Sequence, residues 1–250
     1  MQTFTDLQAA FYCRSIETST YASVLSSPIS QYITESHKRC LDIGAGSGIL
    51  TRMCLRSGMD WFAVEPNLYM QSVLQQQAKA LQNSNIYLHI VDSTWENLPE
   101  TYCAEIVLAC NVGATHHNPA DFFHAMAPRC QTMTWVVAAQ EGPSTFCAAG
   151  FLPQELHGAS ITPAIDKTLS MLSPHEQPHQ ITLHDWIFRA KFEHVDAAIS
   201  HFLNRLDLKP GDSHRAQPIS SYITKHAEIG ADGVVIACKK RSAVLNWSWS

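Results

Sequence analysis

The sequence predicts a doubly wound α/β fold, with a mostly parallel seven-stranded sheet and helices on both faces. Three observations support this prediction. Apolar runs alternate with segments of helical periodicity over residues 39–140. The runs are continuously apolar, as in strands that helices cover on both sides. The first run ends in a glycine-rich turn, Gly44-Ala45-Gly46-Ser47-Gly48, directly before helical spacing begins.

Length and composition describe an ordinary globular chain and exclude several classes of function. The chain has 250 residues, 46% hydrophobic and 16% charged, which excludes bulk disorder. The net charge of -5 argues against a DNA partner and disfavours an RNA partner, because proteins that grip phosphate backbones are basic. The eight cysteines include no C-x-x-C pair, so neither a zinc knuckle nor a thioredoxin-like redox pair is indicated. His117, Asp121 and His124 share helical spacing but form an incomplete ligand shell, so we expect no metal site.

The chain also lacks the usual marks of secretion or membrane insertion. Its first residues, MQTFTDLQAA, have no basic start and no apolar core of the kind that a secretion signal carries. The longest apolar runs are too short to cross a bilayer. We therefore expect a cytoplasmic protein with no membrane partner; the pattern leaves its oligomeric state open.

The N-terminal residues 1–38 are expected to form a helical cap. Leu7, Phe11 and Tyr12 have the spacing of one helix face. A second helix is expected from about Tyr21 to Ile33, interrupted near its proline, because proline breaks the backbone ladder of a helix interior.

The α/β core is expected over residues 39–140. Its helices follow the glycine turn, the second strand and Asn118-Pro119, where asparagine is a favourable N-cap and proline suits the first turn. The expected strands are Arg39 to Ile43, Trp61 to Val64, Ile86 to Val91, Ile106 to Cys110 and Met133 to Ala139.

Beyond the core the regular alternation stops. Residues 141–230 are expected to form a substrate lid or insertion that holds a late strand, Ile181 to Phe192, and an amphipathic helix, Val195 to Leu206. Residues 231–250 are expected to supply the last strand, Gly233 to Cys238, and a tail whose structure the pattern does not assign.

The glycine turn favours one class of ligand over another. Glycines let a ligand approach the backbone closely, and the N-terminus of the following helix attracts an anionic group. A dinucleotide fingerprint that began at Gly44 would place its third glycine at position 49, which is Ile49. The carboxylate of Asp42, just before the turn, would repel a pyrophosphate. It would suit a ligand that carries an ammonium group beside a carboxylate, as an amino acid does.

Polar residues follow the next three strands as well. Glu65, followed by Pro66, ends the second strand 21 residues after the first glycine, and its two oxygens can accept both hydroxyls of a ribose. Asp92-Ser93 follows the third strand, and Asn111 follows the fourth. All of them stand at carboxyl ends of strands, where open α/β sheets bind ligands.

Taken in this order, the motifs resemble the Rossmann-like class I S-adenosylmethionine-dependent methyltransferases over residues 39 to about 140. The resemblance implies S-adenosylmethionine as cofactor, with Asp92 accepting from the adenine amino group, the next backbone N–H meeting the ring, and Asn111 facing the reacting end. The cofactor-binding residues that it implies are Asp42, Gly44, Ala45, Gly46, Gly48, Glu65, Pro66, Asp92, Ser93 and Asn111.

The same resemblance implies that the loop after the fourth strand, Asn111 to His117, lines the acceptor side. It lacks the D/N-P-P-Y/F motif of nucleic-acid amine methylators. His116 and His117 are candidates for a general base, with Asn111 as a third catalytic candidate. A hydroxyl or amine acceptor needs such a base, whereas a carboxylate does not.

Residues 181–238 are similar in layout to small-molecule carboxyl methyltransferases such as the trans-aconitate and malonyl-carrier-protein enzymes. In those enzymes the added helix and the segment before it build a lid. In this sequence, Tyr12 and Tyr21 stand where the resemblance implies that the N-terminal helices close over the cofactor. The expected function is methyl transfer to an oxygen or nitrogen of a small molecule, a carboxylate included. Three alternatives remain: a non-catalytic S-adenosylmethionine-binding module, an RNA or protein methyltransferase, and a nicotinamide oxidoreductase, which Asp42 and Ile49 disfavour.

Overall fold

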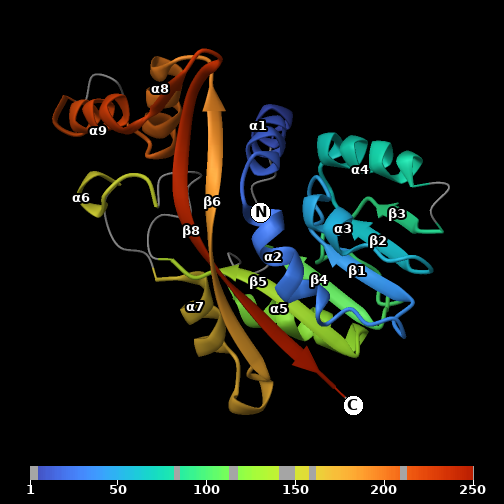
Figure 1. Cartoon of the computed structure of the whole chain (residues 1–250). Coiled ribbons are helices and arrows are strands. Elements are labelled where there is room, and N and C mark those ends of the chain that lie inside the picture. Colours follow the sequence, from blue (N-terminus) through green and yellow to red (C-terminus); the bar gives the residue numbers. More distant parts are fainter. Residues whose placement is uncertain are drawn as a thin grey trace.

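The computed structural model describes residues 5–81, 85–112, 118–140, 150–157, 162–208 and 213–249. A central sheet forms the core, and two long strands, β6 and β8, extend beyond it as a ribbon that carries helices α8 and α9 at its far end (Figure 1). Helix α1 lies between this ribbon and α4 (Figure 1). None of the helices in these ranges is long and apolar enough to span a membrane.

Within the described residues the sheet has eight strands, one more than the seven predicted. Seven of them follow the order β3-β2-β1-β4-β5-β8-β6, and the short β7, which pairs with β8, is the additional strand. Strands β1 to β5 are parallel, whereas β8 is antiparallel to both β5 and β6. This confirms the predicted doubly wound, mostly parallel sheet. The strands are β1 (Arg39–Ile43), β2 (Asp60–Val64), β3 (Tyr87–Val91), β4 (Ile106–Cys110), β5 (Thr132–Ala138), β6 (Gln180–Phe192), β7 (Glu228–Gly230) and β8 (Gly233–Ser248).

Helices cover both faces of the sheet, because neighbouring residues of a strand point to opposite sides. Cys40 belongs to one buried apolar cluster, together with Leu25 of α2 and Leu50 of α3. The next residue, Leu41, belongs to a second cluster, together with Phe122 of α5. The helices are α1 (Asp6–Glu17), α2 (Tyr21–Ser30), α3 (Ile49–Cys54), α4 (Leu68–Ala80), α5 (Pro119–Met126), α6 (Gln154–His157), α7 (Ala164–Met171), α8 (Val195–Arg205) and α9 (Ser213–His226), with 3-10 turns at Ala127–Arg129 and Pro174–Glu176.

The last strand is longer than the sequence pattern predicted. It was expected to end at Cys238, but β8 continues to Ser248 and pairs with β5 along its second half. Trp247, placed in an unassigned tail, is buried, and its indole N–H donates to the backbone oxygen of Glu176 at 2.8 Å. The sequence pattern did not predict this continuation because the charged run Lys239-Lys240-Arg241 interrupts the apolar residues of the strand. The run lies where the ribbon is partly exposed, so the strand can continue through it.

Two helices also differ from the sequence prediction. The pattern did not predict α9, whose interior contains Pro218, yet Ile219 and Ile223 of this helix are fully buried. Leu7 does not share a buried face with Phe11 and Tyr12, since its side chain is 84% exposed. The division of the chain into a cap, a core, an insertion and a last segment stays a prediction.

The connection between α1 and α2 is fastened to the outer strand β6. The backbone N–H of Thr20 donates to the oxygen of Ile187 at 3.0 Å, and the N–H of Ile187 donates to the hydroxyl of Thr20 at 2.8 Å. The N–H of Arg189 donates to the hydroxyl of Ser19 at 2.8 Å. These bonds hold the N-terminal helices beside the carboxyl ends of the core strands.

Candidate functional site

The glycine turn between β1 and α3 has the backbone that its sequence predicts. Gly44, Gly46 and Gly48 have φ angles of 68°, 58° and 70°, in the left-handed region that glycine adopts without strain. A Cβ at Gly44 would lie 3.1 Å from Val112 Cβ, and one at Gly48 would lie 2.6 Å from Leu74 Cδ2. At Gly46 the nearest atom would be 4.0 Å away. Gly46 therefore leaves open space beside the loop, where a ligand could approach the backbone.

Glu65 at the end of β2 is buried and faces this turn. Its Oε2 accepts from the N–H of Gly46 at 2.9 Å, and its Oε1 accepts from the N–H of Asn67 at 2.9 Å. Burial raises the pKa of the Glu65 carboxyl, and these two N–H donors act against that rise. Each carboxylate oxygen has a second lone pair, so both can still accept from a ligand.

Asp42 lies beneath the turn and is 3% exposed. Its Oδ2 accepts from the hydroxyl of Thr51 at 2.5 Å and from the indole N–H of Trp61 at 3.3 Å. Burial raises the pKa of Asp42 to about 6, although both donors lower it. The side chain thus links the end of β1, just before the turn, to α3 and β2. Its predicted contact with an ammonium group stays a prediction.

Gln71 of α4 joins the ends of two strands, and the sequence interpretation missed it. Its Nε2 donates to the backbone oxygen of Glu65 at 2.8 Å and to Oδ1 of Asp92 at 2.9 Å. Its spacing gave a signal: Gln71 stands three residues before Leu74, so a polar side chain falls on the face expected to be buried.

The remaining predicted cofactor residues lie around this connection. Asp92 and Pro66 are exposed, whereas Ala45 and Ser93 are half-buried. The hydroxyl of Ser93 donates to the backbone oxygen of Thr94 at 2.9 Å. The hydrogen-bonded set formed by Gly46, Glu65, Gln71 and Asp92 thus spans the carboxyl ends of β1, β2 and β3; we call it the strand-end network.

Asn111 ends β4 in a left-handed conformation, with φ 58°. Its amide Nδ2 donates to the hydroxyl of Tyr21 at 3.1 Å. Tyr21 is buried and packs edge-on against Trp186, with ring centroids 4.8 Å apart. Burial raises the pKa of Tyr21 and of Cys110 well above their ordinary values. The left-handed backbone of Asn111 is uncommon for a residue other than glycine, and such conformations often occur at functional sites.

Helix α1 also reaches the site. Burial and the nearby groups Cys110, Cys13 and Glu65 raise the pKa of the Tyr12 phenol. The thiol of Cys13 donates to Sδ of Met70 on α4 at 3.2 Å. Both tyrosines of the predicted cap therefore lie near the strand ends.

The two histidines predicted as general bases, His116 and His117, lie outside the described residues, so their role stays a prediction. The nearby His124 points elsewhere: its Nε2 lies 2.8 Å from Oε1 of Glu176. Two hydrogen bonds from Ser173 and, to a smaller extent, this contact with His124 lower the pKa of Glu176 to about 2.

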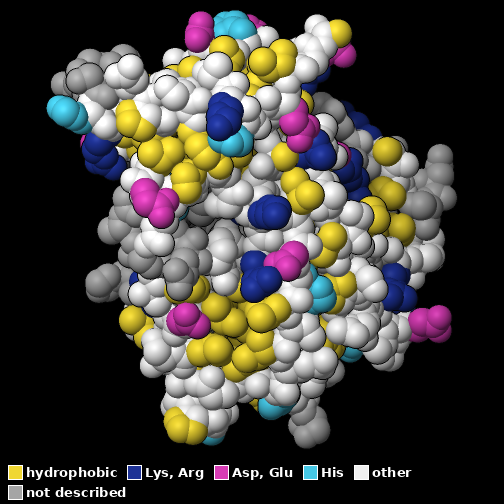
Figure 2. Space-filling model, turned by 60° about the vertical axis from the view of Figure 1, so that its left-hand side comes forward, with side chains coloured by type: hydrophobic (Ala, Val, Ile, Leu, Met, Phe, Trp, Pro, Cys, Tyr) yellow, Lys and Arg dark blue, Asp and Glu magenta, His cyan; other side chains and the backbone are white. Residues whose placement is uncertain are grey.

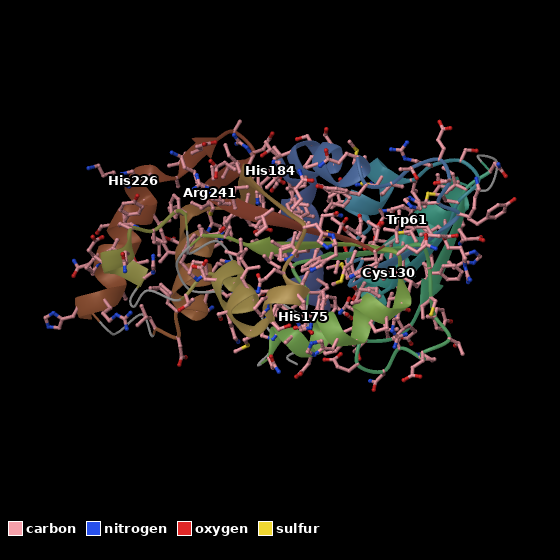
Figure 3. The ribbon with its side chains drawn as sticks, turned by 90° about the horizontal axis from the view of Figure 1, so that it is seen from below. Trp61, Cys130, His175, His184, His226 and Arg241 are labelled. Carbon is pink, nitrogen blue, oxygen red and sulfur yellow. The ribbon has the colours of Figure 1, made fainter. Side chains whose placement is uncertain are left out.

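Other histidines are dispersed. His175, His184 and His226 lie well apart from one another (Figure 3). Within the ranges that the structure describes, no three histidine, cysteine or acidic side chains are grouped so that they could hold a metal ion.

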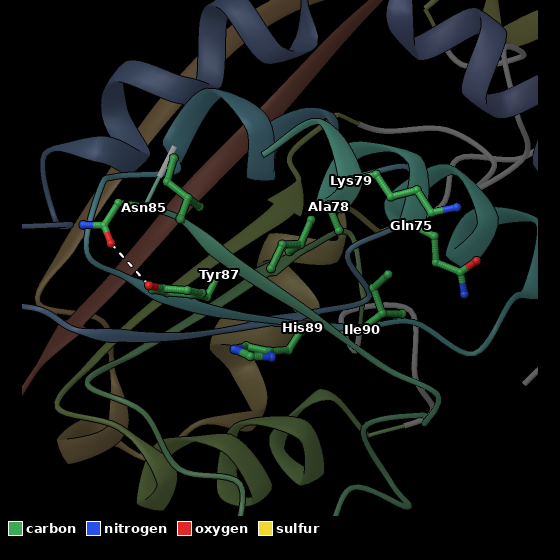
Figure 4. A pocket seen from close by; sticks show the side chains of 9 residues that line it. Gln75, Ala78, Lys79, Asn85, Tyr87, His89 and Ile90 are labelled. Atoms are coloured by element: carbon green, nitrogen blue, oxygen red, sulfur yellow. Dashed lines mark hydrogen bonds between the residues drawn. The ribbon is translucent and has the colours of Figure 1, made fainter. Parts of the chain in front are cut away.

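A surface groove of about 720 Å³ lies between α4 and the outer strand β3 (Figure 4). Gln75, Lys79, Tyr87 and His89 are among its lining residues, and the Tyr87 hydroxyl donates to Oδ1 of Asn85 at 3.3 Å. None of the predicted cofactor residues lines this groove. It is separate from the strand-end network.

No protein-family model matches the sequence, and no curated protein is detectably similar to it. Solved structures are similar in fold. A candidate RNA methyltransferase from Pyrococcus horikoshii has 11% identity and a TM-score of 0.54, covering 92% of this chain and 84% of its own. A candidate methyltransferase from Bacillus halodurans C-125 has 14% identity and a TM-score of 0.53, covering 90% of this chain and 97% of its own.

The [4+2]-cyclase SpnF is similar too, with 13% identity and a TM-score of 0.52, covering 90% of this chain and 79% of its own. These likenesses and the strand order show the class I methyltransferase fold that the motifs predicted. Because one of the similar structures is a cyclase, the fold alone does not define the reaction.

Proposed function

We propose that this chain binds S-adenosylmethionine at the carboxyl ends of β1, β2 and β3 and catalyses transfer of its methyl group to a small molecule. The strand-end network carries the proposal. It joins the open turn at Gly46 to the buried acid Glu65 and, through Gln71, to the exposed acid Asp92. Three separate sequence motifs are thereby held in one connected arrangement at the edge where such sheets bind ligands.

The residues present fit the parts of that ligand. The open space at Gly46 admits a close approach to the backbone. The remaining lone pairs of Glu65 suit two ribose hydroxyls, and the exposed carboxylate of Asp92 suits an adenine amino group. Asp42 is the proposed partner of the ligand's ammonium group. When bound, S-adenosylmethionine supplies a methyl group on a positively charged sulfur.

The chain's part in the reaction is to hold the acceptor in line and to exclude water. Asn111, just after β4, is hydrogen-bonded to Tyr21. In this proposal Asn111 faces the methyl group that is transferred. His116 or His117 is the proposed base for a hydroxyl or amine acceptor, and a carboxylate acceptor would need neither. The net charge of -5 supports a small acceptor over RNA.

Calorimetry with S-adenosylhomocysteine, with NAD as the comparison ligand, tests the cofactor. We expect binding of the first and none of the second, and absence of binding at millimolar S-adenosylhomocysteine would contradict the proposal. Consumption of the methyl donor in the presence of metabolite pools then tests turnover. Binding without consumption would favour the non-catalytic module, and a salt-dependent affinity for RNA would favour the nucleic-acid alternative.

A further inference from the structure

Gln71 stands in the first turn of α4 and is 8% exposed. Asn67 caps this helix by accepting from the N–H of Met70 at 3.0 Å, which fixes where the first turn begins. The N–H of Gln71 donates to the oxygen of Asn67 at 2.9 Å. Both the backbone and the burial of Gln71 therefore restrict its side chain.

The chemistry of its two partners orients the Gln71 carboxamide. One partner is the backbone carbonyl oxygen of Glu65, and the other is the Asp92 carboxylate. A carbonyl oxygen and an ionised carboxylate can each accept a hydrogen bond but cannot donate one. Only the NH₂ group can donate to both, so the amide has one consistent orientation. Its two N–H bonds are thereby used, one on each strand end.

This arrangement fixes one oxygen of Asp92 and leaves the other available. Oδ1 is held at 2.9 Å by Gln71, while Asp92 itself is exposed. Within the described ranges, Oδ2 has no hydrogen-bond partner. An exposed carboxylate without such a tether would sample several rotamers, and ordering it would cost free energy each time a ligand bound.

We propose that Gln71 is a positioning residue that orients Asp92 to distinguish a 6-amino purine from a 6-oxo purine. This inference rests on the proposed function. The amino group of adenine donates to a carboxylate, whereas the 6-oxygen of hypoxanthine is an acceptor and would face the same negative oxygen. An Asp92 side chain held in one orientation increases the affinity for the 6-amino purine and decreases the affinity for the 6-oxo purine. A mobile Asp92 side chain has a smaller effect on both affinities.

Calorimetry with S-adenosylhomocysteine and with S-inosylhomocysteine tests this role. The wild type should bind the adenosyl ligand more tightly, by about 10- to 100-fold, the scale of a hydrogen bond to a charged group. Gln71→Met keeps the length of the side chain but removes its donors, and we expect it to reduce this ratio by about tenfold. Gln76→Met, on the exposed side of the same helix, is the matched control and should keep the wild-type ratio.

Gln71→Glu provides a second variant in case Gln71→Met does not fold, because it keeps the shape and replaces the donors with a carboxylate beside Asp92. It should also reduce the ratio. In an Asp92→Asn background, Gln71→Met should change the ratio by less than twofold, because the two residues act through one contact.

Different results would overturn different claims. No binding of S-adenosylhomocysteine by the wild type would contradict the proposed function itself. Binding with equal affinity for the two ligands, or a Gln71→Met protein that weakens both ligands equally and keeps their ratio, would leave Gln71 a purely structural residue and overturn this inference.

Discussion

The N–H of Gly46 lies 2.9 Å from Oε2 of Glu65, so the turn after β1 is hydrogen-bonded directly to the end of β2. The turn leaves open space at Gly46 and the acid keeps unused lone pairs, so both halves of this contact remain able to meet a ligand. A substitution at either residue should therefore reduce ligand affinity more than it reduces the stability of the fold.

Glu65→Gln should weaken binding of S-adenosylhomocysteine by about 1.5–3 kcal/mol, the scale of hydrogen bonds to a charged group. The amide keeps the shape of the acid but loses its charge and turns one acceptor into a donor. Calorimetry measures the change. Glu193→Gln, an exposed acid, is the control and should bind as the wild type does. Equal affinity in both variants would show that Glu65 only fastens the turn.

Gly46→Ala should fold but lose affinity for S-adenosylhomocysteine by more than about tenfold. The added Cβ costs roughly 1–2 kcal/mol of backbone strain and occupies the space beside the loop. Gly48→Ala is the comparison: its Cβ would lie 2.6 Å from Leu74 Cδ2, so it should lose more stability. Thermal unfolding and calorimetry separate the two effects. A Gly46→Ala protein with wild-type affinity would exclude this face of the loop from the site.

Asp42 should make stability depend on pH. Its folded pKa of about 6 lies above the ordinary value near 3.9, so the native state binds the proton more tightly than the unfolded state does. This contribution to the free energy of unfolding is complete below about pH 4 and is lost as the pH rises through about 6. A shift of about two units corresponds to ~3 kcal/mol.

Asp42→Asn should remove that dependence, because an amide oxygen can still accept from Thr51 and Trp61. Urea unfolding at pH 4.5 and 7.5 measures it, with the exposed Asp232→Asn as control. If Asp42→Asn loses as much stability over this range as the wild type, another group is responsible.

Ligand binding gives an independent test of the predicted contact between Asp42 and an ammonium group. A positive charge next to Asp42 should lower its pKa, so binding of S-adenosylhomocysteine near pH 6 should release about half a proton. Calorimetry in buffers of different ionisation enthalpy measures this release. The Asp42→Asn protein should release none, and a wild type that releases none would place the ammonium group elsewhere.

For a hydroxyl or amine acceptor, His117→Ala should lower turnover by about 10²–10⁴-fold while the affinity for S-adenosylhomocysteine stays unchanged, because a base acts only in the chemical step. For a carboxylate acceptor, the same change should raise mainly KM. Steady-state kinetics on His116→Ala, His117→Ala and the double variant distinguish these cases. Wild-type kcat and KM in all three would remove both histidines from the site.

The parts of the site that could be predicted are those defined by local sequence. Glu65 and Asp92 follow their strands directly and Gly46 follows β1 within three residues, and parallel strands bring their carboxyl ends to one edge. Gln71 could not be assigned a partner, since its contact with Asp92 joins residues that only the packing of α4 brings together.

Two other elements show what local patterns cannot reveal. The second half of β8 was obscured by the charged run before it, whereas burial of Trp247 depends on pairing with β5. Helix α9 contains Pro218, which locally disfavours a helix, and burial of Ile219 and Ile223 offsets that preference. Tertiary packing decides both.

The position of β8 between β5 and β6 has a consequence for synthesis. During translation β8 emerges after both of its neighbours, so β5 and β6 each present an unpaired edge until the last strand inserts. The bonds from Thr20 to Ile187 likewise span most of the chain and form late. Such a topology folds slowly, and a nascent or truncated chain that lacks β8 exposes two unpaired strand edges, which makes it prone to aggregation and a target for chaperones.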